Sequence, residues 1–314
     1  MPKKTGAHAL LVPFLEAGST AVIVPIASSE RTVQATITLI SLDPERPIGG
    51  ETIEIATGVV QQAGFAIENA RLYRQLEQFT RSMQNALLPS GRIEVEGLEL
   101  GAVYESSARL EVGGDLYDYL VLEDGQLVVV LGDVTGHGVD AAADMAMAKF
   151  VFRSLVRDHR DPGQLLARVN DVICREVGAG KFVTMLSLTY DPATGELACA
   201  SAGHPAPRIV GADGTVVALQ VSGLALGIDP GQRYEVTRRP LERGSVAVLF
   251  TDGVIEARRD GELYGERRLD LFLARRGELP AEELARAVVA DCRRHGGGEL
   301  ADDCAVVVLR RIER

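Results

Sequence analysis

Aspartates stand beside glycines or next to apolar runs in four short segments of the sequence. The segments are EVGGDLYDY with Asp115 and Asp118, LGDVTGHG with Asp133, FTDGVIEA with Asp252, and ELADDCAVVVL with Asp302 and Asp303. In three of them an apolar run typical of a strand lies directly beside the acid, so several acids are expected to converge on one rim of a sandwich. Converging carboxylates raise one another's pKa unless cations lie among them.

Carboxylate oxygens without His or Cys companions favour Mg²⁺ or Mn²⁺ over Zn²⁺. Two such ions, about 4 Å apart, would bridge a water molecule and make it hydroxide-like at neutral pH. The acids together therefore predict a site for phosphoester hydrolysis. Taken singly, three of the segments have a simpler structural explanation that involves no metal. Asp252 and its glycine form a common turn pair, and the glycines before Asp115 could make a β-bulge. Asp302 and Asp303 could be a solvated pair ahead of a strand.

The stretch QLVVVLGDVTGHGVDAAAD, residues 126–144, predicts a junction between a strand and a helix. Leu127–Leu131 is an apolar run typical of a buried strand, and an Ala-rich helix is expected from Val139. The glycines between them let the backbone turn tightly and expose its carbonyls beside Asp133. A carboxylate on such a turn is a natural ligand for a hard cation.

The same junction also fits a dinucleotide-binding fingerprint, GxGxxA, from Gly136 to Ala141. Asp158 follows Gly138 by twenty residues, near the spacing expected of a ribose-binding acid. However, Asp133 would repel the pyrophosphate, and Asp158 stands at an expected helix end instead of at the tip of a second strand. We therefore favour the metal site over this alternative.

Strand patterns dominate the sequence from Ile93 to the C-terminus. They are LELGAVYES, DLYDYLVLE, QLVVVLGD, FVTMLSLTY, ELACASAG, SVAVLFTDG and CAVVVLRR. Turn signals such as DPATG separate several of them, which indicates hairpins and a largely antiparallel sheet. Helices are expected over Val139–Arg157, Pro162–Val177 and Ala281–His295. Strands in hairpins with helices grouped between them predict an α+β sandwich.

The N-terminal part alternates apolar and polar residues over Leu10–Ala27 and Thr32–Leu42, which predicts a short antiparallel meander. A helical pattern begins at Ile53 and runs without Gly or Pro from Phe65 to Leu88. Its apolar residues recur at spacings of three and four, which suits a coiled-coil-like seam. Such a long helix needs a partner, either a second copy of itself or the neighbouring domain.

The composition excludes several classes of protein. The chain has 314 residues, 46% of them hydrophobic, and 44 acidic against 33 basic residues give a net charge of −11. A nucleic-acid-binding surface is therefore not expected, and no apolar run reaches the length of a membrane span or resembles a signal peptide. The four cysteines are scattered, which favours buried thiols in a reducing cytoplasm.

In combination, EVGGDLYDY, GDVTGHGVDAAADMA, FVTMLSLTYDPATGELACASAGHPAP, TDGVIEAR with YGERRL, and DDCAVVVL resemble the SpoIIE-like and RsbU-like branch of the PPM metal-dependent serine/threonine phosphatases. The resemblance runs from about Met83 to Leu309 and keeps the family's order. It implies a PPM-type antiparallel β-sandwich flanked by helices (αββα). It also implies a phosphatase that uses two Mn²⁺ or Mg²⁺ ions to activate a water against phosphoserine or phosphothreonine.

The resemblance also assigns roles to single residues. Asp115, Asp133, Asp252 and Asp302 would bind the metals together with the carbonyl of Val134, and Asp303 is the alternative to Asp302. Asp118 is expected to be structural or to lie behind the ligands. Candidates for contacts with the substrate phosphate are Gly113, Gly114, Arg109 and His137. For Arg109 we favour a surface arginine over a phosphate contact. His137 and His204 could act as proton donors, but a metal-bound water needs no protein base, which favours a structural role for both. Ala305 replaces the Thr or Ser that the family usually has after the acidic pair.

Upstream of this region, GVVQQAGFAIENARLYRQLE and the preceding meander resemble the second half of a GAF sensory domain. We expect a partial GAF-like domain at 1–57, a long linker and dimerisation helix at 58–92 and the phosphatase domain at 93–314. We expect the linker helix to form a homodimer and the chain to be cytoplasmic. The family resemblance implies a phosphorylated anti-sigma-factor antagonist as the substrate. An alternative is a catalytically silent PPM-like interaction module, which the full set of acids argues against.

Overall fold

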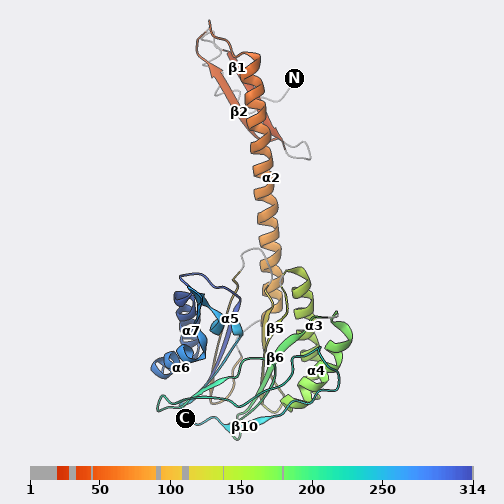
Figure 1. The fold of residues 1–314 in the computed structure, drawn as a ribbon, viewed down its shortest axis with the longest axis vertical. Coiled ribbons are helices and arrows are strands. Elements are labelled where there is room, and N and C mark those ends of the chain that lie inside the picture. Colours follow the sequence, from red (N-terminus) through yellow and green to blue (C-terminus); the bar gives the residue numbers. More distant parts are fainter. Residues whose placement is uncertain are drawn as a thin grey trace. The chain divides into compact units, whose positions relative to one another are not determined.

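The computed structural model describes residues 20–27, 33–43, 45–89, 93–107, 113–136, 138–178 and 180–312 (Figure 1). The chain divides into two compact units, Met1–Gln78 and Phe79–Arg314. No helix in the described part of the chain is long and apolar enough to cross a membrane.

The first unit contains an antiparallel pair of strands, β1 (Thr20–Ala27) and β2 (Val33–Ser41), in which Thr20 faces Ser41. These strands correspond to the expected meander, whose part before residue 20 lies outside the described residues. Helix α2 (Gly50–Leu87) begins in this unit and continues past its end. It therefore starts eight residues before the expected linker at 58–92.

The second unit is built from two five-stranded antiparallel sheets. In the first sheet the strand order is β10-β7-β6-β5-β4, and in the second it is β3-β14-β11-β8-β9. The first sheet contains β4 (Asp115–Val121), β5 (Leu127–Val134), β6 (Val183–Asp191), β7 (Glu196–Ala202) and β10 (Thr237–Pro240). The second contains β3 (Leu98–Glu105), β8 (Arg208–Val210), β9 (Val216–Ala218), β11 (Val246–Phe250) and β14 (Cys304–Arg311). A small hairpin joins β12 (Arg258–Arg259) to β13 (Glu262–Leu263).

Helices cover the outer face of each sheet, as Figure 1 shows. On the first sheet lie α3 (Val139–Leu155) and α4 (Pro162–Glu176). On the second lie α5 (Asp252–Glu256), α6 (Gly265–Arg276) and α7 (Ala281–His295). This is the expected αββα sandwich, so the predicted fold class is confirmed.

The two faces of each central strand pack into different cores, because successive side chains of a strand point to opposite sides. In β5, Leu127, Val129 and Leu131 pack between the two sheets. The intervening Val128 and Val130 pack under α3 and α4. Both faces are therefore apolar, which explains why the strand is one continuous hydrophobic run instead of an alternating pattern.

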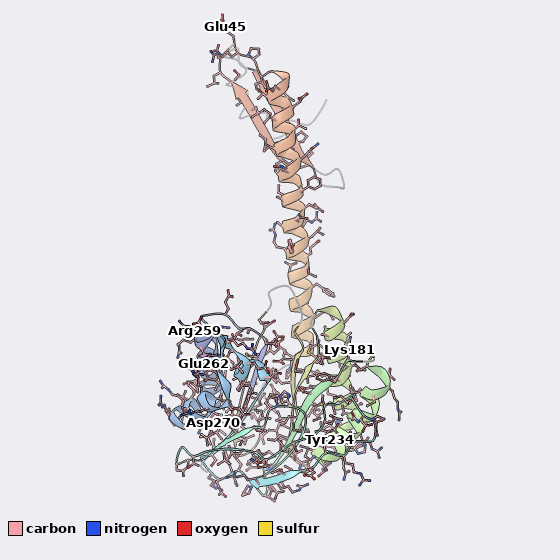
Figure 2. The ribbon with its side chains drawn as sticks, in the orientation of Figure 1. Glu45, Lys181, Tyr234, Arg259, Glu262 and Asp270 are labelled. Carbon is pink, nitrogen blue, oxygen red and sulfur yellow. The ribbon has the colours of Figure 1, made fainter. Side chains whose placement is uncertain are left out.

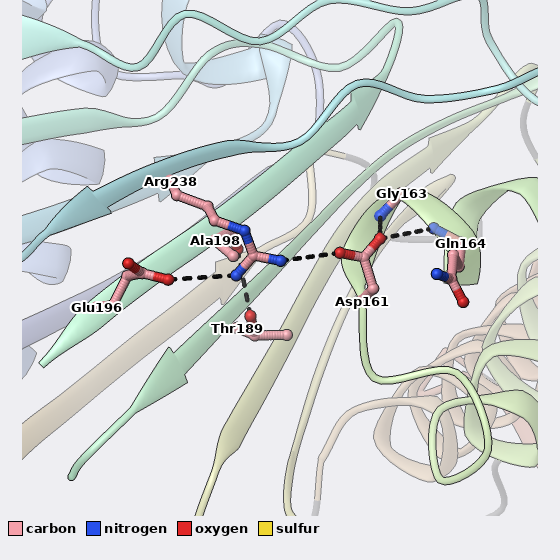
Figure 3. A network of polar contacts seen from close by, with 7 residues as sticks. All are labelled: Asp161, Gly163, Gln164, Thr189, Glu196, Ala198 and Arg238. Atoms are coloured by element: carbon pink, nitrogen blue, oxygen red, sulfur yellow. Dashed lines mark hydrogen bonds and ion pairs between the residues drawn. The ribbon is translucent and has the colours of Figure 1, made fainter. Parts of the chain in front are cut away.

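Polar contacts fix helix α4 to the edge of the first sheet (Figure 3). The Asp161 side chain caps the helix by accepting hydrogen bonds from the amides of Gly163 and Gln164, at 3.1 Å each. Arg238 on the edge strand β10 pairs with Asp161 at 3.0 Å and with Glu196 at 3.2 Å. The cap thus also holds the start of the helix against the sheet.

Candidate active site

Three aspartates meet where the two sheets come together. Asp115 is the first residue of β4 and lies directly opposite Asp133, near the end of β5. Asp252 begins α5, just after β11 of the other sheet. One carboxylate oxygen from each lies within 4.8 Å of the others. The structure therefore brings together three of the acids predicted from the sequence, two on the first sheet and one on the helix that follows β11 of the second.

The three carboxylates are disfavoured as anions when no cation is present. Burial is the main reason that the pKa of Asp115 lies well above its usual range, and Asp133 and Asp303 raise it further. Burial and the negative charge of Asp252 raise the pKa of Asp133 to about 7. The pKa of Asp252 is also raised, by burial and then by Asp302. A bound cation would remove this repulsion, so the donor set fits a hard metal ion.

Thr251 holds Asp115 in place. Its Oγ1 donates a hydrogen bond of 2.6 Å to Asp115 Oδ2 and accepts one of 2.9 Å from the amide of Ala305. The residue is fully buried, and its amide also donates to the Ala305 carbonyl. Thr251 was not predicted from the sequence, where its place directly before Asp252 was the one signal of its role. It links β11, β14 and β4 at the site.

Asp302 and Asp303 differ in what surrounds them. The Asp303 carboxylate is buried and accepts hydrogen bonds from the hydroxyls of Tyr104, Ser106 and Ser107 and from the Ser107 amide. Asp302 is exposed, and its Oδ1 accepts a bond from the Asp303 amide. Asp302 lies near enough to raise the pKa values of Asp133 and Asp252. Asp303 is therefore occupied in holding loops, whereas none of the described residues donates a hydrogen bond to Asp302 Oδ2.

Two glycines allow the backbone to approach these acids closely. A Cβ atom added to Gly113 would lie 1.3 Å from Asp303 Oδ2. At Gly114 it would lie 2.6 Å from both Asp133 Oδ1 and the carbonyl oxygen of Val134. These two positions exclude any side chain. The candidate substrate contacts Arg109 and His137 lie outside the described residues.

Asp118 faces away from the acid cluster and forms a buried ion-pair network. Its fully buried carboxylate accepts hydrogen bonds from Arg153 Nε at 2.5 Å and Arg153 Nη2 at 2.9 Å, and Lys149 Nζ lies 3.6 Å away. Lys149 also donates to the carbonyl of Leu87, the last residue of α2. These contacts join β4, α3 and the end of α2. The structure therefore gives Asp118 a structural role.

His204 is buried between the sheets. Its Nδ1 lies 3.0 Å from Thr184 Oγ1, and Thr184 pairs across the sheet with Asp133. Its backbone exchanges two hydrogen bonds with the Ser201 hydroxyl. Burial lowers the pKa of His204 to about 3, so the ring is neutral at physiological pH. The ring therefore supports the sheet and has no proton to supply as an imidazolium.

This depressed pKa predicts an acid sensitivity that His204→Gln should reduce. An unfolded histidine binds a proton below about pH 6.5, whereas the folded one stays neutral until about pH 3. Between these two pH values the unfolded chain binds a proton at this residue and the folded chain does not. The free energy of unfolding therefore falls as the pH drops from 6.5 towards 3, by at most about 1.4 kcal/mol per pH unit. Urea unfolding at pH 7, 5.5 and 4.5 should therefore show a flatter decline for His204→Gln. Equal slopes for His204→Gln and the unaltered protein would contradict the assignment.

The two sheets and their covering helices form the fold of the PPM-type (PP2C) phosphatase domains. The structure is similar to the SiaA-PP2C domain of Pseudomonas aeruginosa, with a TM-score of 0.68 at 23% identity over 78% of this chain and 99% of that domain. It also matches the catalytic domain of the serine/threonine protein phosphatase PstP, solved with two manganese ions, with a TM-score of 0.51 at 15% identity over 69% of this chain and 99% of that one. At these identities the likeness concerns the fold.

The sequence comparison defines the family. Residues 123–312, more than half of the chain, match the family model of Stage II sporulation protein E (SpoIIE), and the chain belongs to this family. It is also similar to the phosphoserine phosphatase RsbU of Bacillus subtilis, with 29% identity over 256 residues that cover 79% of this chain and 76% of RsbU. The resemblance to the SpoIIE-like and RsbU-like phosphatases is therefore confirmed.

Proposed function

We propose that the chain is a metal-dependent protein serine/threonine phosphatase that hydrolyses phosphoserine or phosphothreonine on a regulatory protein. The observation that carries this proposal is the convergence of Asp115 and Asp133 on the first sheet with Asp252 at the start of α5, a group of described residues that includes no His or Cys. Two Mn²⁺ or Mg²⁺ ions bound there would supply positive charge to the phosphoryl oxygens and a water activated for attack. Membership of the SpoIIE family and the similarity to RsbU support the same reaction.

In this proposal, Asp115, Asp133, Asp252 and Asp302 hold the ions together with the carbonyl of Val134. Asp302 is chosen over Asp303 because the buried Asp303 carboxylate already accepts four hydrogen bonds. Thr251 orients the Asp115 carboxylate through its 2.6 Å hydrogen bond. Gly113 and Gly114 let the backbone before β4 pack directly against Asp303, Asp133 and the Val134 carbonyl, which helps to fix these groups in place.

The substrate that we propose is a phosphorylated anti-sigma-factor antagonist in the cytoplasm. This assignment rests on the similarity to RsbU. The fold alone does not identify a substrate. The test is to incubate the purified chain with phosphorylated antagonists from its own genome, with manganese, without added metal and with a chelator. We expect phosphate release that requires the metal. Binding of an antagonist without any release would instead support the silent interaction module.

Helix α2 is proposed to join two copies of the chain and to transmit a regulatory signal to the phosphatase domain. In the same proposal, the residues before the helix form a partial GAF-like domain. Phe65, Leu72, Leu76 and Phe79 recur along it with heptad-like spacing, and all four are exposed. Met83 differs, because it packs against the core under α3 and α4. Met83 therefore tests packing as well as association, and Leu76 is the cleaner position for a test of dimerisation.

We expect Leu76→Glu to weaken or abolish the dimer, because a carboxylate in an apolar seam loses its hydration without gaining a partner. The side chain at position 76 is 44% exposed in the single chain. Gln78→Glu, two residues further on, adds the same charge outside the seam and should leave the dimer intact. Light scattering coupled to size exclusion at several concentrations measures both. A monomer at high concentration for the unaltered protein would contradict the proposal.

A further inference from the structure

A groove of about 600 Å³ lies on the flank of the phosphatase unit formed by α6, α7 and the β12–β13 hairpin. The described residues that line it include five arginines and a histidine, with Asp291 as the one acid: Arg259, Arg268, Arg275, Arg276, Arg294 and His295. We call it the arginine groove. Leu271 and Phe272 form part of its apolar surface. Figure 2 marks Arg259, Glu262 and Asp270 on this flank. Such a concentration of positive charge contrasts with the net charge of −11 on the whole chain.

The pairing of charges leaves part of this positive charge available. Arg268 pairs with Glu262 at 2.6 Å, and Arg294 pairs with Asp291 at 2.8 Å. Arg275 and Arg276, in the last turn of α6, are exposed and have no ion pair among the described residues. A helix C-terminus favours cationic side chains even without a ligand, so the position of Arg275 and Arg276 does not by itself show what binds there.

The acids of α6 are engaged elsewhere, which is why they do not neutralise these arginines. Asp270 accepts a hydrogen bond of 2.7 Å from Arg208 Nε, and Glu266 lies 3.0 Å from Arg208 Nη2. Arg208 is 1% exposed on β8, at the base of the helix. The buried arginine thus occupies both helix acids, and the exposed arginines of the same helix are left to the groove.

Two residues of the groove are close in sequence to proposed metal ligands. Arg259 follows Asp252 by seven residues, and His295 precedes Asp302 by seven residues. Seven residues span at most about 25 Å when fully extended, so Arg259 and His295 each lie within that distance of a proposed metal ligand. A segment bound in the groove can therefore belong to the same molecule as a phosphoserine at the cluster.

We propose that the arginine groove docks an acidic segment of the phosphoprotein substrate; this inference rests on the proposed phosphatase function. Arginine binds carboxylates through paired hydrogen bonds, and the apolar surface beside the arginines suits the aliphatic part of Glu and neighbouring side chains. The rest of this acidic chain repels an acidic partner, so the groove gives such a partner one preferred orientation. The specificity of the enzyme for its protein substrate then depends on charge outside the reacting phosphate.

The test uses two phosphoserine peptides of about fifteen residues, one with Glu and one with Gln at the outer positions, so that the charged residues reach the groove. The quantity measured is the ratio of kcat/KM for the Glu peptide to that for the Gln peptide within each protein, at low ionic strength with manganese. We expect a ratio of roughly five or more for the unaltered protein, falling towards one at about 0.5 M salt.

Arg275→Glu/Arg276→Glu should bring the ratio to one or below, and Arg275→Gln/Arg276→Gln should give an intermediate value. The matched control is Arg233→Glu/Arg243→Glu, which makes the same change in charge at exposed arginines outside the groove and should keep the original ratio. A ratio near one for the unaltered protein, or an equal fall in the control, would overturn the proposal.

Further outcomes distinguish a failure of docking from a failure of the phosphatase activity itself. If the unaltered protein hydrolyses neither peptide, the proposed function fails and the docking proposal fails with it. If both peptides are hydrolysed equally, the proposed function stands and the groove loses its assigned partner. Retention of duplex DNA that Arg275→Glu/Arg276→Glu abolishes, without any preference between the peptides, would assign the groove to nucleic acid and also overturn the proposal.

Discussion

Replacing Asp252 by asparagine is expected to lower the rate of manganese-dependent phosphate release by roughly a thousandfold. Replacing a residue that only supports a metal ligand typically costs ten- to hundredfold. Asparagine keeps the shape of the side chain and removes the negative charge that this acid contributes to the cluster with Asp115 and Asp133. Initial rates of phosphate release from a phosphoserine peptide, measured over a range of manganese concentrations, give the effect on both turnover and metal requirement.

The control for this experiment is Asp158→Asn. Asp158 is an exposed acid that follows α3, and it is the residue on which the dinucleotide-binding alternative depends. Its replacement should leave the rate unchanged. In the absence of metal, Asp252→Asn should also raise the free energy of unfolding, because burial and Asp302 disfavour the charged form of Asp252. Activity that survives both chelation and Asp252→Asn would refute the two-metal hypothesis.

The largest loss of stability is expected from Asp118→Ala, at about 3–5 kcal/mol. The substitution removes a fully buried carboxylate and leaves Lys149, which is itself buried, without its counter-ion. Burial already lowers the pKa of Lys149, while Asp118 acts in the opposite direction. The free energy of unfolding, measured by circular dichroism in urea, tests the prediction directly.

Asp124→Ala provides the comparison, because Asp124 also pairs with an arginine, Arg160, but at the surface. Exposed pairs contribute about 0.2–1 kcal/mol, so this variant should lose no more than that. Similar losses for both variants would show that the Asp118 network does not stabilise the junction of β4, α3 and α2. A loss below about 1 kcal/mol for Asp118→Ala would be equally contradictory.

The sequence predicted much of the phosphatase unit, because its central strands are long apolar runs. β5, β11 and β14 appear where LVVVL, VAVLF and CAVVVL stand. Helix α6 was not predicted. Its sequence, GERRLDLFLARR, carries six charged residues, and Leu269 and Leu273 alone are fully buried. The short strands β8 and β9 were also missed, since three residues each give no usable pattern of alternation.

The sequence predicted the acids of the candidate site but not the residues that hold them in place. Asp115, Asp133 and Asp252 are each marked by a glycine or by the end of a strand, so their local sequence indicates them. Their meeting depends on strand pairing, which places Asp115 opposite Asp133. The contact of Thr251 with Asp115 joins residues 136 positions apart, and that of Lys149 with Leu87 joins residues 62 positions apart. No local pattern marks such tertiary contacts.

The acids come from the first sheet and from the helix that follows β11 of the second sheet, and this has a mechanical consequence. A cation held by Asp115 and Asp133 on one side and by Asp252 on the other would act as a cross-link between the two halves of the sandwich. Unfolding the domain would then require the ion to be released, so metal and fold would be thermodynamically linked. At a hundredfold excess of free metal over its Kd, such linkage adds about 2.7 kcal/mol per site. The supply of manganese would thereby set the equilibrium stability of the folded domain as well as its activity.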